Sequence, residues 1–99
     1  MMLPAKLGSC SKNLAKKLAP NVRVNVLAPG NVYFKGGSWD EKIQKDKDKI
    51  QNIIKSTVPM NRFATTVEIA DSAVFLCSDR ASFITGSVLV IDGGQTSGF

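Results

Sequence analysis

Four residues, Pro29 to Val32, have the types and the position of a loop that contacts a ligand. They follow Val22–Ala28, where valines first alternate with polar residues and an apolar run follows, a pattern typical of a β-strand. If that strand is parallel to its neighbour, its carboxyl end is where open α/β sheets bind ligands. Gly30 lets the backbone come close to a ligand, and Pro29 fixes its path. The alternative is a plain strand-ending turn, and the residues alone leave both open.

Composition excludes several other kinds of chemistry. The 99 residues contain no histidine and two cysteines, Cys10 and Cys77, which lie far apart. A Cys/His zinc site and catalytic pairs of the Ser-His or Cys-His kind are therefore excluded, and we expect no metal site. Two isolated cysteines favour free thiols in a reducing compartment, so we expect a cytoplasmic protein.

Membrane insertion and secretion are not expected either. The longest stretches without a charge, residues 24–34 and 81–91, have eleven residues each. A membrane-spanning helix needs ~20. The apolar run at the N-terminus is also too short for a secretory signal.

The elements before and after the loop set its position. Leu7–Leu18 has apolar residues at helical spacing with lysines between them, which predicts an amphipathic helix that stops at Pro20. The chain from Ser38 to Glu41 fits a capping box with Ser38 as N-cap, and an apolar stripe behind it predicts one helix to about Ser56.

The last third of the chain predicts a buried helix and a strand. Thr65 and Glu68 fit a second capping box, and the helix behind it, residues 66–77, has an apolar face wide enough to predict burial against a sheet. Ser87–Ile91 is apolar and β-branched, which predicts a strand buried on both faces and hence parallel. The order helix, strand, helix, helix, strand therefore predicts an α/β fold with a parallel crossover.

The charge is distributed unevenly. Met1–Arg62 holds twelve basic and four acidic residues, a net charge of +8, whereas Phe63–Phe99 holds one arginine and four acids, a net charge of −3. A basic surface can attract nucleic acid or a phosphate-bearing ligand. The lysines of residues 42–55 alternate with acids, which favours a solvated helix face, and no aromatic residues are interleaved for stacking. We therefore do not expect nucleic acid as a partner.

The chain resembles the C-terminal part of the short-chain dehydrogenase/reductase family, NAD(P)-dependent oxidoreductases with a Rossmann-type sheet. The resemblance covers nearly all of the chain and rests on four stretches in order: Ser11–Pro20, Val22–Gly30, Val58–Phe63 with Thr66–Arg80, and Ala81–Gly86 through Val90–Gly94. It implies one partial Rossmann-like domain over residues 1–99, the C-terminal portion of a doubly wound parallel sheet. It also implies hydride transfer between NAD or NADP and a small carbonyl or alcohol substrate.

The resemblance assigns roles to the loop and to the segment after it. Pro29, Gly30, Asn31 and Val32 match the family's cofactor-binding loop, in which the backbone at the position of Val32 meets the nicotinamide carboxamide. Residues 31–60 then match the segment that covers the substrate, with Trp39 and Met60 as candidate lid contacts. For Trp39 the alternative is a place in the core, because it lies on an apolar helical stripe.

The chain also departs from the family pattern. None of its eight glycines forms the glycine-rich turn that seats the cofactor pyrophosphate, and the family's catalytic Asn, Ser and Tyr have no counterpart. Lys6 is the candidate for the family's catalytic lysine, which lowers the pKa of the tyrosine and binds the nicotinamide ribose. Met2 stands four residues earlier, where the tyrosine is expected. Counting back from Pro20 instead puts the lysine near Pro4, and Lys6 is then a solvent-facing helix residue.

These departures lead to two hypotheses. The first is a truncated oxidoreductase that is inactive as the isolated chain. The second is a non-catalytic interaction module that pairs with a full-length relative. Because two strands make a poor sheet, we expect an exposed apolar face and self-association or docking on a partner. The resemblance implies that residues 66–77 and 87–91 form the interface, with a second copy or with a relative, since members of the family commonly pair through the final strand and its helix.

Overall fold

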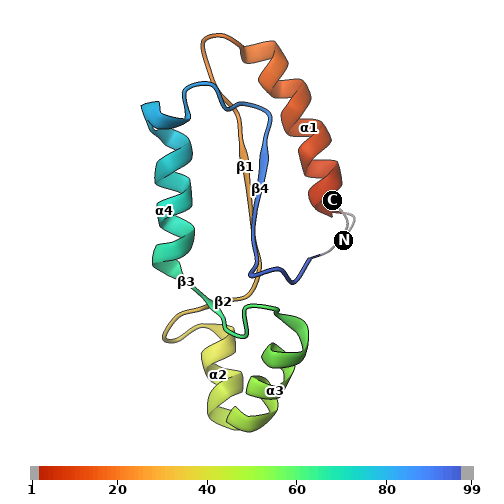
Figure 1. Cartoon of the computed structure of the whole chain (residues 1–99), viewed down its shortest axis with the longest axis vertical. Coiled ribbons are helices and arrows are strands. Elements are labelled where there is room, and N and C mark those ends of the chain that lie inside the picture. The colour runs from red at the N-terminus through yellow and green to blue at the C-terminus, as the bar shows by residue number, and fades with distance from the viewer. Residues whose placement is uncertain (1–2, 97–99) are drawn as a thin grey trace.

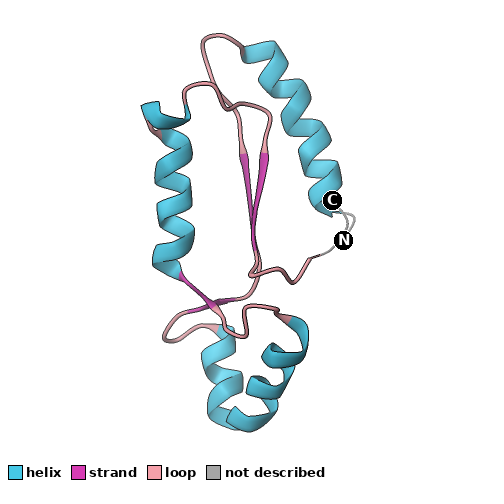
Figure 2. Cartoon of the chain, viewed as in Figure 1, coloured by secondary structure: helices cyan, strands magenta, loops and turns pink. Residues whose placement is uncertain are grey.

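The chain folds into two lobes joined end to end, as shown by a computed structural model that describes the backbone of residues 3–96 and the side chains of residues 9–96 (Figure 1). The longest dimension is 49 Å against 25 and 20 Å for the other two. The upper lobe holds a pair of strands with a helix on either side, and the lower lobe holds two short helices (Figure 2). The α/β class is therefore confirmed.

Two parallel strands form the centre of the upper lobe. β1 (Val26–Pro29) pairs with β4 (Val88–Ile91), with Val26 opposite Val88 and Pro29 opposite Ile91. Helices α1 (Leu3–Leu18) and α4 (Thr66–Cys77) flank the pair, and the 3-10 turn η1 (Asp79–Ala81) follows α4. The predicted parallel pairing is confirmed.

The predicted strand over Val22–Ala28 is too long at its start, because before Val26 side chains take the place of part of the backbone ladder. The Val24 N–H donates to the Thr85 hydroxyl at 3.0 Å, although the Gly86 N–H still donates to the Val24 carbonyl at 2.7 Å. The Asn25 side chain accepts hydrogen bonds from the Ser87 N–H at 3.1 Å and from its hydroxyl at 2.6 Å. Arg23 donates to the carbonyls of Leu76 at 2.8 Å, in the last turn of α4, and of Ser78 at 3.2 Å, just after it. These bonds hold residues 23–25 beside Ser87 and the end of α4, although residues 23–25 do not form part of the strand.

The lower lobe contains two helices where one was predicted. α2 (Ser38–Lys45) and α3 (Lys47–Thr57) are separated by Asp46, whose φ of −157° and ψ of 85° break the helix. The Asp46 side chain accepts from the Lys49 N–H at 3.1 Å and so caps α3. The apolar stripe continues across this break, which is why periodicity alone predicted a single helix.

The predicted capping box at Ser38 is also wrong. Ser38 is the first helical residue, and the N-cap position is Gly37, which provides no side-chain cap. The carboxylate of Asp40 instead accepts from the Gly36 N–H at 2.9 Å, so it provides a hydrogen-bond partner for the backbone of the loop just before α2. The second box is confirmed: Thr65 caps α4, and Glu68 returns the bond to the Thr65 backbone.

A second pair of short strands joins the lobes and was not predicted. β2 (Val32–Tyr33) is parallel to β3 (Ala64–Thr65). Below this junction, Ile50, Ile54 and Val58 form a buried cluster. Trp39, Ile43 and Phe63 pack against it.

The predicted burial of α4 and β4 is wrong for this chain. Val67 and Val74 on α4 are 63% and 68% exposed, and Leu89 on β4 is 37% exposed. The apolar face of α4 is wider than a two-stranded sheet can cover. The predicted exposed apolar face is therefore present.

Candidate functional site

The loop Pro29–Val32 lies where the carboxyl end of β1 enters the junction between the lobes (Figure 1). The Gly30 N–H donates to the carbonyl of Ile91 at 2.9 Å, which extends the β1–β4 ladder by one bond. A Cβ at Gly30 would lie 2.8 Å from the Cβ of Asp92 and 2.9 Å from its Cα. Glycine is therefore required here because the chain after β4 comes so close.

The backbone of Val32 faces away from its partner strand. Val32 lies opposite Ala64, and the Ala64 N–H donates to the carbonyl of Asn31 at 2.9 Å. In a parallel pair, only one of the two opposite residues uses its own N–H and C=O across the ladder, and these groups bond to the residues before and after its partner. Ala64 is that residue here, so the N–H and C=O of Val32 point to the opposite edge of the small sheet.

The turn after β4 holds the loop from the other side. The carboxylate of Asp92 accepts from the Thr96 N–H at 2.7 Å and from the Gly94 N–H at 2.9 Å. Hydrogen bonding by Thr96, followed by the backbone bonds of this turn, lowers the pKa of Asp92. The Asn31 side chain donates to the Gln95 amide oxygen at 2.9 Å, so this turn and the loop are tied directly.

The same turn holds the return from the lower lobe. Gly93 has a φ of +63°, and a Cβ there would lie 2.9 Å from a methyl group of Val58. The Met60 N–H donates to the Gly93 carbonyl at 3.1 Å. A small cavity of about 100 Å³ lies between these segments and is lined by Asn31, Met60 and Asp92 among others. The loop Pro29–Val32, the turn Asp92–Gly94 and the start of the Pro-x-x-Arg element (Pro59–Arg62) thus form one connected site.

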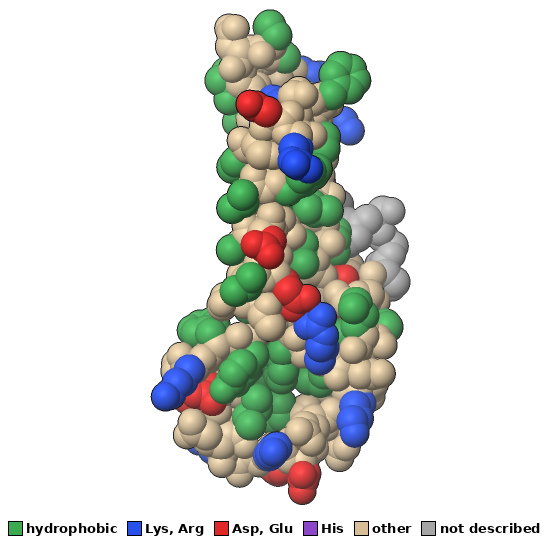
Figure 3. Space-filling view, turned by 60° about the vertical axis from the view of Figure 1, so that its left-hand side comes forward, with side chains coloured by type: hydrophobic (Ala, Val, Ile, Leu, Met, Phe, Trp, Pro, Cys, Tyr) green, Lys and Arg blue, Asp and Glu red, His purple; other side chains and the backbone are tan. Residues whose placement is uncertain are grey.

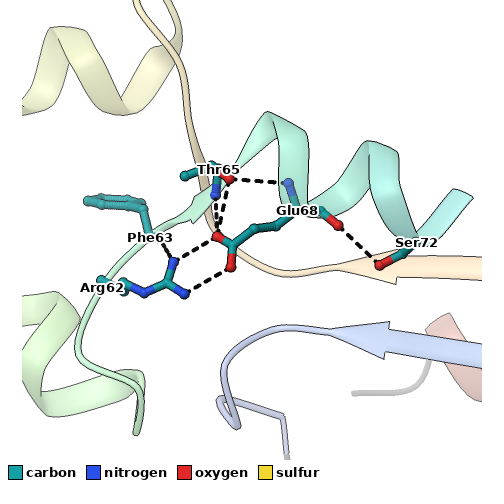
Figure 4. A network of polar contacts seen from close by, with 5 residues as sticks. All are labelled: Arg62, Phe63, Thr65, Glu68 and Ser72. Carbon is teal, nitrogen blue, oxygen red and sulfur yellow. Dashed lines mark hydrogen bonds and ion pairs between the residues drawn. The ribbon is translucent and has the colours of Figure 1, made fainter. Parts of the chain in front are cut away.

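Arg62 and Glu68 fix the entry into α4 (Figure 4). The guanidinium donates through two nitrogens to the two carboxylate oxygens, at 2.7 and 2.9 Å, and also to the Phe63 carbonyl at 3.1 Å. Glu68 accepts in addition from the Thr65 N–H at 2.9 Å. Hydrogen bonds from Arg62, then from Thr65, lower the pKa of Glu68 to about 2, and Glu68 raises the pKa of Arg62.

Tyr33 lies at the start of the lower lobe, and its hydroxyl is directed to Asp40 rather than to a place where it could protonate a substrate. Its hydroxyl donates to Asp40 at 2.9 Å, and this bond raises the pKa of Tyr33. Hydrogen bonds from Gly36 and then from Tyr33 lower the pKa of Asp40. Tyr33 therefore fastens β2 to α2.

The remaining predicted site residues are distributed as follows. Trp39 packs against Phe63, with ring centroids 5.2 Å apart, and belongs to the cluster of the lower lobe. Met60 is 61% exposed. Lys6 lies in α1, and its side chain is outside the described part of the structure.

Sequence reasoning missed the ion pair between Arg62 and Glu68 and the bond between Tyr33 and Asp40, and only the first left a signal. The sequence placed Arg62 only in the stretch Val58–Phe63 that carries the family resemblance, and Glu68 only in a capping box. The pairing of Arg62 with Glu68 could have been predicted. The glutamate of a capping box uses one carboxylate oxygen for the cap, and its other oxygen can accept a hydrogen bond from a nearby cation. No local pattern indicates the bond between Tyr33 and Asp40.

The described residues offer no further centre of chemistry. Cys10 and Cys77 are free and exposed. Among the side chains of residues 9–96, no group of three or more His, Cys, Asp or Glu could hold a metal ion. None of the helices between residues 3 and 96 has the length and apolar character needed to cross a bilayer.

Comparison with known proteins gives consistent matches over almost the whole chain. A family model described as enoyl-(acyl carrier protein) reductase matches residues 2–96. An uncharacterized oxidoreductase of Schizosaccharomyces pombe is 37% identical over 95 residues, which is 95% of this chain and 36% of that protein. The 3-oxoacyl-(acyl-carrier-protein) reductase of Aquifex aeolicus is 39% identical over 86 residues, 86% of this chain and 32% of that protein.

A solved structure shows the same fold. L-sorbose reductase from Gluconobacter frateurii, complexed with NADPH and L-sorbose, matches with a TM-score of 0.81 and 34% identity over 96% of this chain and 39% of that one. The chain thus spans about a third of the length of the curated relatives it matches.

Proposed function

This chain belongs to the short-chain dehydrogenase/reductase family, and we propose that it forms the nicotinamide-facing wall and the substrate cover of an NAD(P)-dependent oxidoreductase. The observation that carries the proposal is the orientation of Val32. Its N–H and C=O point to the sheet edge away from β3, and Val32 follows the carboxyl end of β1 by three residues.

These backbone groups fit a primary amide. A carboxamide has an N–H₂ donor and a carbonyl acceptor, and a single residue with both backbone groups turned to one side can bond to each. Pro29 and Gly30 hold this residue in place, because Gly30 continues the ladder to Ile91. Asn31 positions it from the other side through Gln95. We therefore assign Pro29–Val32 to the binding of NAD or NADP through the nicotinamide.

The bound nicotinamide supplies or accepts the hydride, and the residues of this chain position the reactants and exclude water. We assign residues 31–60 to the cover over a small carbonyl or alcohol substrate. In support of this, the segment is anchored at both ends: Tyr33 bonds to Asp40 near its start, and Met60 bonds to Gly93 at its end. A cover anchored in this way can exclude water during hydride transfer.

Lys6 is assigned to the family's catalytic lysine. It lies in the first turns of α1, where a cation bound to the nicotinamide ribose would also lower the pKa of a nearby tyrosine. Such a tyrosine has no counterpart at Met2, and Tyr33 is engaged by Asp40. We therefore expect no hydride transfer by the 99-residue chain alone.

A chimera tests the proposal. The part of the Aquifex aeolicus 3-oxoacyl-(acyl-carrier-protein) reductase that precedes the match is joined to this chain at Ser11, inside α1, so that the relative supplies the glycine-rich turn and the catalytic side chains. We expect the chimera to oxidise NADPH or NADH in the presence of a 3-oxoacyl substrate. The 99-residue chain is the control and should show no oxidation. A chimera that melts cooperatively and binds the cofactor but transfers no hydride would contradict the proposal.

A second candidate function rests on the uncovered face of α4. Val67, Val74 and Phe75 are 63%, 68% and 44% exposed on a helix whose other side contacts β1. An apolar surface of this kind is typical of an interface between chains. We propose that residues 66–77 and 87–91 associate with a second copy or with a full-length relative, and this role would not require catalysis.

A further inference from the structure

The lower lobe contains a cavity that the cofactor-facing site does not use. Its volume is about 540 Å³, within the range of about 300–1,000 Å³ that is usual for small-molecule sites. The loop residues Pro29–Val32 and Asp92 do not line it. Side chains alternate along a strand, so the side chain of Tyr33, which lines the cavity, lies on the opposite face of β2 from the side chain of Val32.

The floor of this cavity is apolar. Ile43 from α2 and Ile50 and Ile54 from α3 form one side, and Tyr33 and Phe63 form the other. Ile50 and Ile54 belong to the buried cluster of the lobe, so the floor is part of a packed core. Figure 3 shows hydrophobic side chains in the corresponding hollow of the lower lobe, with both basic and acidic side chains on the surface around it.

The charged residues that line the cavity are all basic. Lys47 and Lys55 lie eight residues apart on α3, about 12 Å along the helix, with the floor between them. Arg62 also lines it, but its guanidinium is paired with Glu68. No Asp or Glu is among the lining residues, and within the described part of the chain neither lysine forms an ion pair.

We propose that this cavity binds a soluble amphipathic anion, a single-chain aliphatic carboxylate whose tail lies on the isoleucine floor and whose carboxylate pairs with Lys47 or Lys55. The floor explains the need for an apolar tail, because the transfer of each methylene from water onto an apolar surface is favourable. The two lysines that line the cavity explain the need for one negative charge on the ligand. The cavity lies largely within the segment 31–60 that we assign to the substrate cover, but neither Pro29–Val32 nor Asp92 lines it. We therefore propose that its ligand is distinct from the substrate that would meet the nicotinamide.

The chain contains its own reporter for this site. Trp39 is the single tryptophan, and its ring lies 5.2 Å from that of Phe63, which lines the cavity. We would titrate the 99-residue chain with decanoate, decanol and decylammonium and follow Trp39 fluorescence. The expected result is saturable binding of decanoate, weaker binding of decanol and weakest binding of decylammonium.

Charge-reversal variants on the surface of α3 localise the anion. The double variant Lys47→Glu, Lys55→Glu should bind decanoate about threefold to tenfold more weakly, as expected for the loss of one exposed ion pair and the repulsion from the two glutamates that replace the lysines. Lys49→Glu is the matched control, because Lys49 lies on the same helix but does not line the cavity. It should change the affinity much less.

Val74→Asp serves as a second control, because it disrupts the apolar face of α4 without touching the cavity, and decanoate binding should be unchanged. The proposal is overturned if decanoate leaves Trp39 fluorescence unchanged, or if decanol or decylammonium binds as tightly as decanoate. Equal loss in the double variant and in Lys49→Glu would also overturn it. None of these results depends on hydride transfer, so the proposed oxidoreductase role is tested separately.

Discussion

Glu68 shows how one side chain can stabilise two local structures. Its carboxylate accepts from both guanidinium nitrogens of Arg62 and from the Thr65 backbone, while the Thr65 hydroxyl accepts from the Glu68 N–H at 3.1 Å. The Pro-x-x-Arg element and the first turn of α4 are therefore held by the same carboxylate. Loss of either partner should release both.

Removing the cap alone isolates its contribution. Thr65→Ala should lower the free energy of unfolding by about 1 kcal/mol, because the Glu68 N–H loses its acceptor. Thr66→Ala is the matched control, since Thr66 is the first helical residue and is not the N-cap. Urea denaturation followed by Trp39 fluorescence measures both. An equal effect of the two substitutions would contradict the capping role.

The depressed pKa of Glu68 predicts an acid-dependent loss of stability. The pKa falls from 4.5 to about 2 on folding, so the charged carboxylate stabilises the fold at pH values above about 4.5. This contribution should decline as the pH falls from about 4.5 towards 2. Asp40 and Asp92 also have lowered pKa values, so the wild type alone cannot isolate Glu68.

The comparison with Glu68→Gln removes that ambiguity. The variant should be less stable than the wild type at about pH 6, and the difference should shrink at about pH 3. Urea midpoints at both pH values measure it. A difference that stays constant with pH would mean that the charge of Glu68 does not contribute.

At the scale of elements, local sequence patterns predicted the helices, caps and strands that depend on interactions between neighbouring residues. The amphipathic helix before Pro20, the capping box at Thr65 and the apolar strand Val88–Ile91 each depend on neighbouring residues, and the structure contains all three. The break at Asp46 was missed because an aspartate inside a helical stripe is compatible with either a continued helix or a new N-cap. Only the packing of α2 against α3 decides between them.

The site could be predicted only in part for the same reason. The loop Pro29–Val32 was found because it follows a strand and contains Pro and Gly. Its pairing with β3 was missed, because Val32 and Ala64 lie 32 positions apart and two-residue strands have no periodicity. The orientation of the Val32 backbone depends entirely on that distant pairing.

The cluster below the junction predicts different effects for two adjacent isoleucines of α3. Ile54 is 3% exposed and Ile53 is 38% exposed. Ile54→Ala should cost about 2–5 kcal/mol, since it leaves a cavity against Val58 and Ile50, whereas Ile53→Ala should cost much less. Thermal and urea unfolding of both variants measures this. Similar losses would contradict the assignment of the lobe's core.

At the scale of the whole molecule, the elongated shape and the small sheets leave much apolar surface uncovered. Two parallel strands have two open edges, and three or more strands are usually needed for independent stability. Val67 and Val74 lie on the outer side of α4, and Leu89 lies on β4. These surfaces are the places where this chain should meet another.

This surface predicts association that depends on concentration. The wild-type chain should elute as a dimer or larger species at micromolar concentration, because burying large apolar side chains drives association. Val74→Asp should shift it towards the monomer, and Lys49→Asp, a charge change elsewhere on the surface, should not. Size-exclusion chromatography with light scattering measures the mass. A wild-type monomer with a cooperative melt would contradict the predicted interface.

The central claim is that the backbone of Val32 receives the nicotinamide carboxamide. The most direct measurement follows the amide resonances of the isotope-labelled chimera during titration with NADH or NADPH. We expect the Val32 N–H to shift on saturation more than the Ala64 N–H, which donates to Asn31. A Val32 amide that does not move at saturating cofactor would contradict the claim.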